Sequence, residues 1–498
     1  MLDYVIEQTE KYIGSKPKSE RKHIGQFFTS KETAKYMTGL FNIPSQNEIY
    51  ILDPGAGTGI LTAALIDKLQ TRQDVKRINL TCYENEAETA AILRSNLEHI
   101  VEISSVPLTF KIIEENYITS QSDNFNQTIL ANEKPAKFDL VIGNPPYKKI
   151  PKDAKEAAAM PAVCYGAPNL YFLFSAMSLY NLKDGGELVY IIPRSWTSGA
   201  YFKAFRDYFL LEGKIETIHL FVSRDKVFDR ESVLQETMII KMIKQRSLRE
   251  SILITGTQTN ADFENITSIE APYSAVVSHH ENYVFLATDL EQLNTLETLN
   301  KFEDTLPTIG IRMKTGLTVD FRNYEVLREA PGEGVVPLYY AQHIKDGRVV
   351  FPVGKEHEYI ITEQAGLVQK NRNYLFVKRF TAKEEKRRLQ CGIYLSSDQP
   401  EYQLISTQNK INFIDTLNGE GLSVETVYGL FVLFNSTIYD TYYRILNGST
   451  QVNSTEMNAM PVPPLNTIIS NGKKLMESND LSVKNCDSIL KEALLLAR

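Results

Sequence analysis

The segment from Ile49 to Ile66 constrains the fold more than any other part of the chain. A short, mostly apolar run ends at Asp53, the loop Pro54-Gly55-Ala56-Gly57-Thr58-Gly59 follows, and an apolar helix-forming run begins at Ile60. A strand that passes through glycines directly into a helix is typical of the first unit of a doubly wound nucleotide-binding sheet. Glycine lacks a Cβ, so a ligand can approach the main chain of such a loop closely. The segment therefore predicts an α/β fold with a ligand site at this loop.

The chemistry of the glycine loop narrows the choice of nucleotide. A dinucleotide fold prefers Gly-x-Gly-x-x-Gly, whereas the glycines here stand at positions 55, 57 and 59, with Asp53 at the strand end. A carboxylate at that point repels a pyrophosphate and attracts an ammonium group. The cofactor that carries an ammonium, a ribose and an adenine without a phosphate is S-adenosylmethionine. We therefore predict that this cofactor is bound by Asp53, Pro54, Gly55, Ala56 and Gly57.

Two later strand ends add candidates for the same site. The run Asn79–Tyr83 ends at Glu84, and the run Leu108–Ile113 leads to Asn116. An acid at the end of the second strand can accept both ribose hydroxyls. The amide of Asn116 offers a donor and an acceptor to the adenine edge. Taken singly, each would be a solvated strand cap, but their order and spacing favour a cofactor site.

The segment Phe138–Tyr147 supplies the most specific chemistry. Its first five residues predict a short buried strand, which Gly143-Asn144-Pro145-Pro146-Tyr147 must end abruptly, since proline continues neither a sheet ladder nor a helix. The resulting stiff loop carries two acceptors, the Asn144 side-chain oxygen and the Pro145 carbonyl, which suit an exocyclic amino group. Tyr147 offers a flat surface on which a base could stack. By itself the segment could equally be a simple turn.

Length, composition and net charge limit the classes of protein to which this chain can belong. At 498 residues the chain is too long for one core, and 43% hydrophobic with 23% charged residues is typical of a soluble globular protein. No apolar run reaches eighteen residues, and the N-terminus lacks the features of a signal peptide. The four cysteines show no paired spacing, which argues against a zinc site or a disulfide framework and fits a reducing cytoplasm. The net charge of −7 means that local patches must make any nucleic-acid contact.

In this order, Phe27-Phe28-Thr29, the glycine loop, Glu84 and Asn144-Pro145-Pro146-Tyr147 resemble the motifs of γ-class DNA adenine-N6 methyltransferases of type II restriction-modification systems. More narrowly, the chain looks like the methylases that accompany the PstI and BsuBI endonucleases. The resemblance covers residues 20–245 well and the rest by short matches. It implies a doubly wound, Rossmann-like methyltransferase domain followed by a mixed α+β target-recognition domain. We expect a helical N-terminal arm at 1–20, the catalytic domain at 21–250 and the recognition domain at 251–498.

The resemblance also implies roles for individual residues. Phe28 and Thr29 would contact the methionine end of the cofactor. Asn144 and the Pro145 carbonyl, on a loop stiffened by Pro146, would accept from the target amino group. Tyr147 would stack on a base flipped out of the duplex, which the chemistry requires. The far wall of the base pocket would be Phe228, chosen over Phe221. This reaction needs positioning and charge stabilisation but no metal.

Residues 148–168 follow the catalytic loop. They are rich in Lys and Ala and contain Pro151, Pro161 and Pro168. We expect either a mobile flap beside the pocket or a plain surface insertion, and the sequence does not separate the two.

In the C-terminal half, residues 377–388 pack six cations and an aromatic residue into twelve positions. Such clusters track phosphates. The alternative is a solvated helix face on which Glu384 and Glu385 pair with neighbouring cations. We favour DNA contact, mainly through the resemblance, which also implies it for the polar segment 444–456. The predicted DNA-binding residues are Lys378, Arg379, Lys383, Lys386, Arg387, Arg388 and Gln451.

The resulting hypothesis is methylation of adenine N6 in duplex DNA in the bacterial cytoplasm. No nuclease signature is evident, so a partner restriction endonuclease should be a separate chain. The resemblance suggests CTGCAG or a related palindrome as the site. Three alternatives stay open: the same fold acting on cytosine N4, the same fold acting on glutamine or guanine amino groups in protein or RNA, and a DNA-binding specificity subunit with a relic fold.

Overall fold

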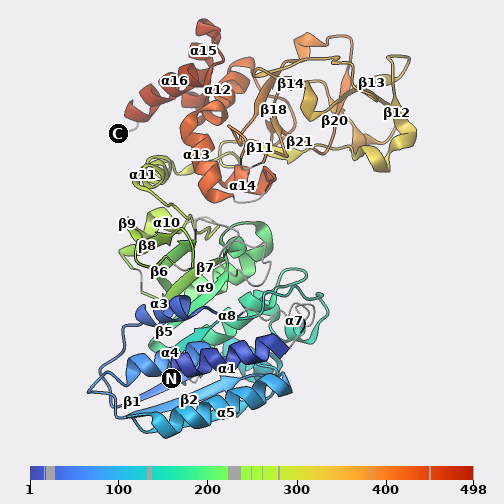
Figure 1. The fold of residues 1–498 in the computed structure, drawn as a ribbon. Coiled ribbons are helices and arrows are strands. Elements are labelled where there is room, and N and C mark those ends of the chain that lie inside the picture. Colours follow the sequence, from blue (N-terminus) through green and yellow to red (C-terminus); the bar gives the residue numbers. More distant parts are fainter. Residues whose placement is uncertain are drawn as a thin grey trace. The chain divides into compact units, whose positions relative to one another are not determined.

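The computed structural model describes residues 1–15, 17, 28–131, 137–221, 237–247, 249–260, 262–278, 281–382, 384–447 and 450–496. The predicted site residues Phe228 and Lys383 lie outside this set. The chain divides into two units, Met1–Val284 and Phe285–Arg498 (Figure 1). The boundary expected at 250/251 is therefore too early. Strands β8 (Ser251–Thr257) and β9 (Thr267–Pro272) lie beyond residue 250 but extend the sheet of the first unit, because β8 pairs with β6 (Lys214–Phe221) and β9 pairs with β8.

The first unit is built on a nine-stranded sheet with the order β3-β2-β1-β4-β5-β7-β6-β8-β9. The neighbours from β3 to β5 run parallel, and β7 is antiparallel to both β5 and β6. This topology confirms the predicted doubly wound α/β class. The strands are β1 (Glu48–Asp53), β2 (Arg77–Tyr83), β3 (Leu108–Ile113), β4 (Phe138–Gly143), β5 (Leu182–Pro193), β6 (Lys214–Phe221), β7 (Thr237–Ile243), β8 (Ser251–Thr257) and β9 (Thr267–Pro272).

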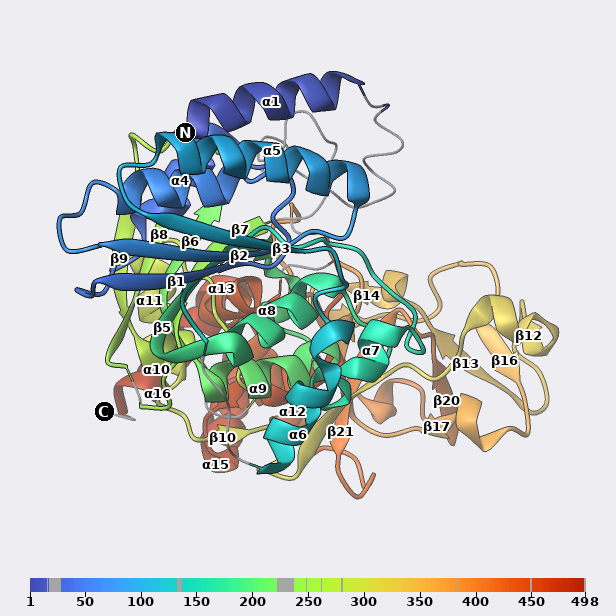
Figure 2. The same cartoon turned by 90° about the horizontal axis from the view of Figure 1, so that it is seen from below.

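Helices cover both faces of the sheet. Helices α1, α4 and α5 lie on one face, and α6, α8 and α9 lie on the other (Figure 2). Because the central strands are buried on both faces, their sequences are nearly continuous apolar runs. The helices are α1 (Leu2–Ser15), α3 (Lys31–Gly39), α4 (Ile60–Leu69), α5 (Ala87–Ile103), α6 (Ser122–Ala131), α7 (Lys155–Ala159), α8 (Leu170–Asn181), α9 (Lys203–Glu212) and α10 (Tyr273–Val276), with 3₁₀ turns at Thr119–Gln121 (η1), Pro161–Val163 (η2), Arg194–Thr197 (η3) and Ala200–Phe202 (η4).

Helix α1 belongs to the first unit and is not a separate arm. Leu2 and Val5 are part of the apolar core formed by the sheet and by α4. The Thr9 hydroxyl lies 2.6 Å from the hydroxyl of Thr58 in the glycine loop. The arm expected at 1–20 is helical over Leu2–Ser15, but its apolar face is buried against the sheet domain.

Residues 148–168 are folded onto the first unit. Ile150, Met160 and Val163 are buried, and the main-chain N–H of Ile150 donates to the carbonyl of Pro168 at 2.8 Å. The buried residues distinguish this segment from a plain surface insertion, and its expected mobility stays a prediction. Its buried apolar residues hold α7 in place beside α6 and α8.

The second unit is mixed α+β, as predicted for the C-terminal half. It contains a six-stranded sheet (β11-β21-β18-β19-β15-β14), a five-stranded sheet (β12-β16-β13-β20-β17) and the pair β10-β22. Its strands are β10 (Asp304–Thr305), β11 (Ile311–Thr315), β12 (Leu327–Arg328), β13 (Val335–Tyr339), β14 (Ile344–Lys345), β15 (Arg348–Val349), β16 (Tyr359–Ile361), β17 (Gln369–Lys370), β18 (Tyr374–Lys378), β19 (Cys391–Tyr394), β20 (Leu404–Thr407), β21 (Ile411–Thr416) and β22 (Pro461–Val462).

The helices of this unit pack closely where two glycines meet. A Cβ on Gly429 would lie 1.9 Å from the Ile468 carbonyl oxygen, and one on Gly472 would lie 1.8 Å from the Glu425 carbonyl oxygen. Only glycine permits this approach of α12 to α15.

None of the described helices is long and apolar enough to span a bilayer. The helices are α11 (Leu290–Leu299), α12 (Val424–Asn435), α13 (Thr437–Leu446), α14 (Ser454–Ala459), α15 (Leu465–Ser478) and α16 (Val483–Leu496).

Candidate active site

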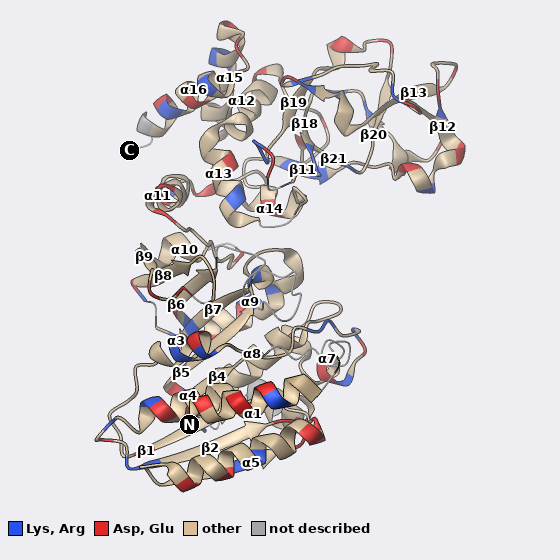
Figure 3. Cartoon of the chain, in the orientation of Figure 1, with Lys and Arg blue, Asp and Glu red and all other residues tan. Residues whose placement is uncertain are grey.

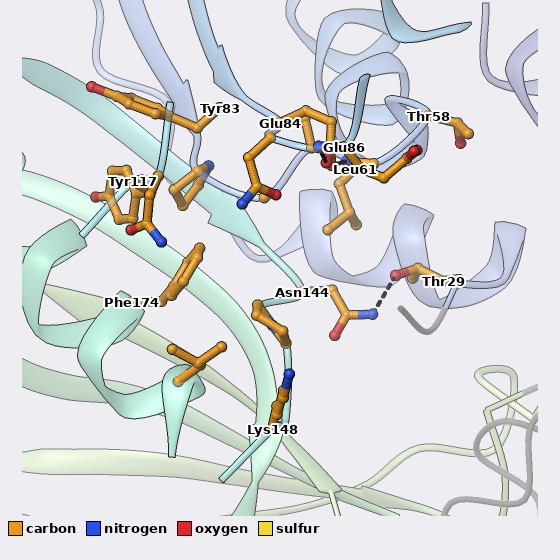
Figure 4. A pocket seen from close by; sticks show the side chains of 18 of the residues that line it. Thr29, Thr58, Leu61, Tyr83, Glu84, Glu86, Tyr117, Asn144, Lys148 and Phe174 are labelled. Atoms are coloured by element: carbon orange, nitrogen blue, oxygen red, sulfur yellow. Dashed lines mark hydrogen bonds between the residues drawn. The ribbon is translucent and has the colours of Figure 1, made fainter. Parts of the chain in front are cut away.

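A cavity of about 440 Å³ opens at the carboxyl ends of the central strands of the first unit. Strand β1 pairs with β2 on one side and β4 on the other, so the crossover connections leave in opposite directions at this point. Ligands of doubly wound sheets bind at such a switch point. The cavity is lined by residues 28–29, 54–58, 60–61, 83–86, 115–117, 144, 146, 148, 156, 170 and 174 (Figure 4).

The glycine loop forms one wall of this cavity. Gly57 and Gly59 have φ values of +54° and +94°, which side chains other than glycine rarely adopt. Gly59 precedes α4 as its N-cap residue and provides no side-chain cap. A Cβ on Gly55 would come 3.6 Å from the Phe174 ring across the cavity. The loop therefore leaves main-chain surface and an uncapped helix start on the cavity wall, and its predicted contact with the cofactor stays a prediction.

Asp53 is buried directly beneath this loop. It is 1% exposed, and Oδ2 accepts a hydrogen bond from the Thr62 hydroxyl at 2.8 Å. Among the described residues, none donates to Oδ1. Burial raises the pKa of Asp53 to about 7, with a smaller contribution from the nearby charge of Glu84. A buried carboxylate whose Oδ1 has no donor in the described part of the chain fits an ammonium partner, although Asp53 is not among the residues that line the cavity.

Glu84 fixes the position of the loop. Its carboxylate accepts the main-chain N–H groups of Gly57 at 3.1 Å and Glu86 at 2.9 Å. These bonds tie the glycine loop to the turn that follows β2. Burial raises the pKa of Glu84. Its side chain lies on the cavity wall, and its predicted contact with the ribose stays a prediction.

Asn116 lies at the end of the cavity that carries aromatic side chains. Its Oδ1 accepts the N–H groups of Ile118 and Thr119 at 3.0 and 3.1 Å, which caps η1. Its Nδ2 donates to Glu156 Oε1 at 2.8 Å. The predicted contact between Asn116 and adenine is not tested by this arrangement, but its oxygen is already engaged.

Sequence reasoning missed several cavity residues. Tyr117 and Phe174 form a ring pair with centroids 5.2 Å apart, and Leu170 lies one helical turn before Phe174 on α8. The spacing of four residues between Leu170 and Phe174 marks one helix face. That pattern could have identified both, had the direction of α8 been known. Lys148 and Glu156 carried no comparable signal. Among the missed residues are Tyr117, Lys148, Glu156, Leu170 and Phe174.

Asn144 stands where β4 ends, on the cavity wall. Its Nδ2 donates to the Thr29 hydroxyl at 3.2 Å, which links the catalytic loop to the segment before α3 (Figure 4). Its Oδ1 accepts from the Tyr147 hydroxyl at 2.9 Å. Phe28, Thr29 and Pro146 also line the cavity. The structure thus brings together the two motifs that lie farthest apart in this part of the sequence.

Tyr147 and Pro145 are buried beside Asn144. The Tyr147 side chain is 8% exposed, and its hydroxyl lies within hydrogen-bond distance of the Ile191 carbonyl at 3.0 Å. Burial raises the pKa of Tyr147 well above its usual range, so the hydroxyl remains a donor. Its ring packs edge-on against Tyr171 at 6.3 Å. The predicted stacking on a base and the acceptor role of the Pro145 carbonyl stay predictions.

The basic segment of the second unit separates into buried and accessible cations. Arg388 is fully buried: Nε donates to the Thr381 hydroxyl at 3.2 Å, and Nη1 donates to the Asn447 carbonyl at 3.3 Å. Arg387 donates to the carbonyls of Phe434 and Ser436. The assignment of Arg388 to DNA contact is wrong, because its guanidinium holds loops together. Arg387 is also engaged in this way.

The other predicted DNA-binding residues are closer to the surface. Lys386 and Gln451 are exposed, and Arg379 Nη2 donates to Gln451 Oε1 at 3.3 Å. Lys378 is partly buried and donates to Gln390 Oε1 at 2.9 Å. The described part of 377–388 is not helical, so the alternative of a solvated helix face is excluded for it.

The sheet order, the glycine loop and the donor set around the cavity define an S-adenosylmethionine-dependent methyltransferase. Comparisons with known proteins agree. Residues 64–228 match the Eco57I restriction-modification methylase family. The chain is 35% identical to type II methyltransferase M.BsuBI of Bacillus subtilis, over 96% of this chain and 95% of that protein. It is 34% identical to type II methyltransferase M.PstI of Providencia stuartii, over 89% of this chain and 87% of that protein.

Among solved structures, the type IIL restriction-modification enzyme MmeI in complex with DNA matches with a TM-score of 0.48 and 12% identity, over 100% of this chain and 73% of that chain. On the similarity to M.BsuBI and M.PstI, the chain belongs to the family of type II DNA methyltransferases of restriction-modification systems.

Proposed function

We propose that the protein transfers the methyl group of S-adenosylmethionine to N6 of an adenine in duplex DNA after flipping that base out of the helix. The observation that carries the proposal is the position of Asn144. Its side chain lies on the wall of the same cavity as the glycine loop, on a loop fixed by two prolines. The type II methyltransferase relatives support DNA as the substrate.

The chemistry follows from the acceptor set. Adenine N6 is a poor nucleophile because its lone pair is delocalised into the ring. Two acceptors, Asn144 Oδ1 and the Pro145 carbonyl, would bond its two hydrogens and draw the nitrogen towards tetrahedral geometry. The localised lone pair can then attack a methyl group in line. The bound cofactor supplies that methyl group, activated as a sulfonium.

The contacts of Asn144 support this role. Because Nδ2 donates to Thr29, the amide is oriented with its oxygen available as the acceptor. The oxygen accepts from the Tyr147 hydroxyl at 2.9 Å, which holds it in place, and the amino group of the substrate would have to bond to this same oxygen. We propose that Tyr147 first fixes the amide and then meets the base with its ring. Such a base cannot reach the cavity while stacked in a duplex.

We further propose that the second unit is the target-recognition domain and that a separate restriction endonuclease cleaves unmodified sites. The support for the first point is the set of accessible polar residues at Arg379, Lys386 and Gln451. The support for the second is membership of a restriction-modification family. Phosphate contacts from such residues would give affinity, while base contacts would set the sequence read.

The test is a transfer assay with tritiated S-adenosylmethionine. The acceptors are a duplex that contains CTGCAG, a duplex of scrambled sequence, single-stranded RNA and a protein extract. Labelled DNA is digested to nucleosides, and the modified base is identified by mass spectrometry. N6-methyladenine in duplex DNA is the expected product. N4-methylcytosine would replace the proposed target base, and label only in RNA or protein would overturn the proposal.

A further inference from the structure

We propose that Glu156 recognises the 6-amino group of the cofactor's adenine. This carboxylate comes from α7, outside every motif that pointed to the cofactor, and it lies on the cavity wall. Its Oε1 accepts from Asn116 Nδ2 at 2.8 Å. Within the described part of the chain, no other donor bonds to it. A carboxylate has about four acceptor positions, so most of its capacity is free.

The state of Asn116 explains why a second acceptor is needed. Its only side-chain oxygen already accepts from two main-chain N–H groups, those of Ile118 and Thr119. The remaining group of this amide is a donor, and it points to Glu156. A 6-amino group is itself a donor and therefore needs an acceptor at this end of the cavity. Glu156 is the carboxylate that Asn116 holds in position there.

The layout of the cavity indicates which end takes the adenine. Figure 4 shows Thr29 and Asn144 towards one end, Tyr117 and Phe174 towards the other, and Glu84 in between. A ligand with its methyl donor near Asn144 and its ribose near Glu84 would place its purine beside the two rings. Aromatic rings suit the faces of a purine. Glu156 and Asn116 then lie at the purine edge.

Glu156 is held rigidly enough for recognition. Its neighbours Ala157, Ala159 and Met160 are buried. The Ala159 carbonyl accepts from Asn126 Nδ2 at 3.1 Å, which ties α7 to α6. A side chain that is fixed before the ligand binds loses little conformational entropy on binding.

A thermodynamic cycle on binding tests this assignment without turnover. Affinities are measured by calorimetry for S-adenosylhomocysteine and for its analogue in which hydrogen replaces the 6-amino group. We expect wild type to lose about tenfold in affinity for the analogue, the scale of a hydrogen bond to a charged acceptor. In Glu156→Gln, the remaining amide oxygen can still accept from Asn116, but a donor replaces the second acceptor. This variant should bind S-adenosylhomocysteine about tenfold more weakly and discriminate between the two ligands less than threefold.

Glu115→Gln is the matched control, because Glu115 also lines the cavity and the substitution removes the same charge. It should keep the wild-type discrimination between the two ligands. If Glu156→Gln also keeps that discrimination, Glu156 only supports Asn116 and the proposal is overturned. An equal loss of discrimination in Glu115→Gln would also overturn the proposal, since removal of either negative charge from the cavity would then have the same effect.

A second inference rests on a different observation and on the proposed action on DNA. One end of the six-stranded sheet carries two exposed phenylalanines, each with an arginine over its ring. Phe321 is 76% exposed with the Arg322 guanidinium 5.5 Å from its ring centre, and Phe380 is 44% exposed with Arg379 at 5.6 Å. We propose that these two pairs contact duplex DNA, with the rings against exposed base faces and the cations at the phosphates.

The segments that carry the two Phe–Arg pairs both bond to the turn at Asn409 and Lys410, which precedes β21. The Asn409 N–H donates to the Thr318 carbonyl at 2.8 Å, three residues before Phe321. The Arg379 N–H donates to the Lys410 carbonyl at 2.9 Å, and Arg379 Nη1 donates to the Asn409 carbonyl at 3.1 Å. Segments from β11, β18 and β21 therefore meet at one rim, and Figure 3 shows Lys and Arg on the ribbon beside β11 and β21.

The charges of this rim favour a polyanion. No described carboxylate forms an ion pair with Arg322, Arg379 or Lys410, although the chain as a whole carries −7. Cations without a described carboxylate partner, next to exposed aromatic rings, match two features of a duplex from which a base is flipped out: its phosphates and the base faces that flipping leaves unstacked. The same rings would be an aggregation risk on a surface without a partner.

The test compares Phe321→Ala, Phe380→Ala and the control Leu417→Ala. Leu417 is 52% exposed and follows Thr416 at the opposite end of β21. Binding to a CTGCAG duplex is measured by anisotropy, with S-adenosylhomocysteine affinity and the urea midpoint as checks on folding. Each phenylalanine variant should bind DNA about tenfold more weakly, the scale of one stacking contact, while Leu417→Ala binds as wild type.

The outcomes separate this inference from the proposed function. Wild type that methylates the duplex, together with phenylalanine variants that bind it normally, overturns the inference alone. Wild type that neither binds nor methylates DNA overturns the proposed function. Weakening by Leu417→Ala to the same degree would show a general surface effect and would also overturn the inference.

Discussion

The cavity of the first unit and the basic segment of the second show two different relations between sequence and site. Glycine-loop residues, Glu84, Asn116 and Asn144 are far apart in the chain, yet they share one cavity. Residues 377–388 are adjacent in the chain, yet they separate in space. Arg388 is fully buried and Lys386 is exposed, with only one residue between them.

The difference follows from the kind of backbone that carries each set. Parallel strands place their carboxyl ends at one edge of a sheet, so residues after successive strands converge regardless of sequence separation. A loop has no period, so the outward direction of each side chain depends on what the loop packs against. Order along the chain is thus a good guide for the first site and a poor one for the second.

The largest expected effect tests the cavity. Asn144→Ala should lower methyl transfer by about 10³-fold or more, because it removes one of the two acceptors on the reacting nitrogen. S-adenosylhomocysteine affinity should change by less than about twofold, since no main-chain element of the cofactor wall is altered. Transfer is followed with tritiated cofactor, and binding by calorimetry. Asn79→Ala, on the partly exposed face of β2, is the control. Turnover of Asn144→Ala within tenfold of wild type would contradict the mechanism.

The next effect tests the buried part of the basic segment. Arg388→Ala should lower the free energy of unfolding of the second unit by about 3 kcal/mol, because it leaves the partners of a buried guanidinium unsatisfied. Arg379→Ala should change it by less than about 0.5 kcal/mol, as expected for a surface substitution. Urea unfolding followed by circular dichroism measures both. Equal stability of the two variants would remove the distinction between buried and accessible cations.

A smaller effect concerns the pH dependence of cofactor binding. Burial raises the pKa of Asp53 to about 7 in the free protein, so below pH 7 its carboxyl is mostly neutral. An ammonium partner favours the ionised form, and binding must release that proton. Affinity for S-adenosylhomocysteine should therefore rise about tenfold from pH 6 to pH 8. Asp53→Asn should flatten this dependence. Calorimetry in buffers of different ionisation enthalpy should detect the proton released by wild type, and none would contradict the role of Asp53.

The raised pKa of Asp53 also makes the free energy of unfolding depend on pH. The folded protein holds the Asp53 proton more tightly than the unfolded chain does, because the folded pKa is raised. The contribution of this group to the free energy of unfolding should therefore be largest at acid pH and fall as pH rises to about 7. In Asp53→Asn this part of the pH dependence should disappear from urea titrations.

The smallest effect tests the accessible cations. Arg379→Ala should weaken DNA binding a few-fold and reduce the slope of log affinity against log salt by about 1, the value for one phosphate contact. Anisotropy at several salt concentrations measures the slope. Lys474→Ala on α15, an exposed lysine paired with Glu492, should leave it unchanged. An unchanged slope in Arg379→Ala would place this residue away from the phosphates.

Sequence reasoning was reliable where local pattern and topology act together. Each of the first four strands was located by its apolar run, and the helix after the glycine loop was located by its position. The domain boundary was placed too early because no feature in the sequences of β8 and β9 indicates that they join the preceding sheet.

The sequence by itself determined the cofactor class, the doubly wound fold and part of the set of residues that line the cavity, because strand periodicity and glycine turns are local properties. Only the tertiary structure decided that Glu156 bonds to Asn116, that Asn144 bonds to Thr29 and that Arg388 is buried. Each of these contacts joins segments whose approach depends on how helices and loops pack over the sheet. Packing of this kind is set by the whole set of buried side chains, and no single stretch of sequence encodes it.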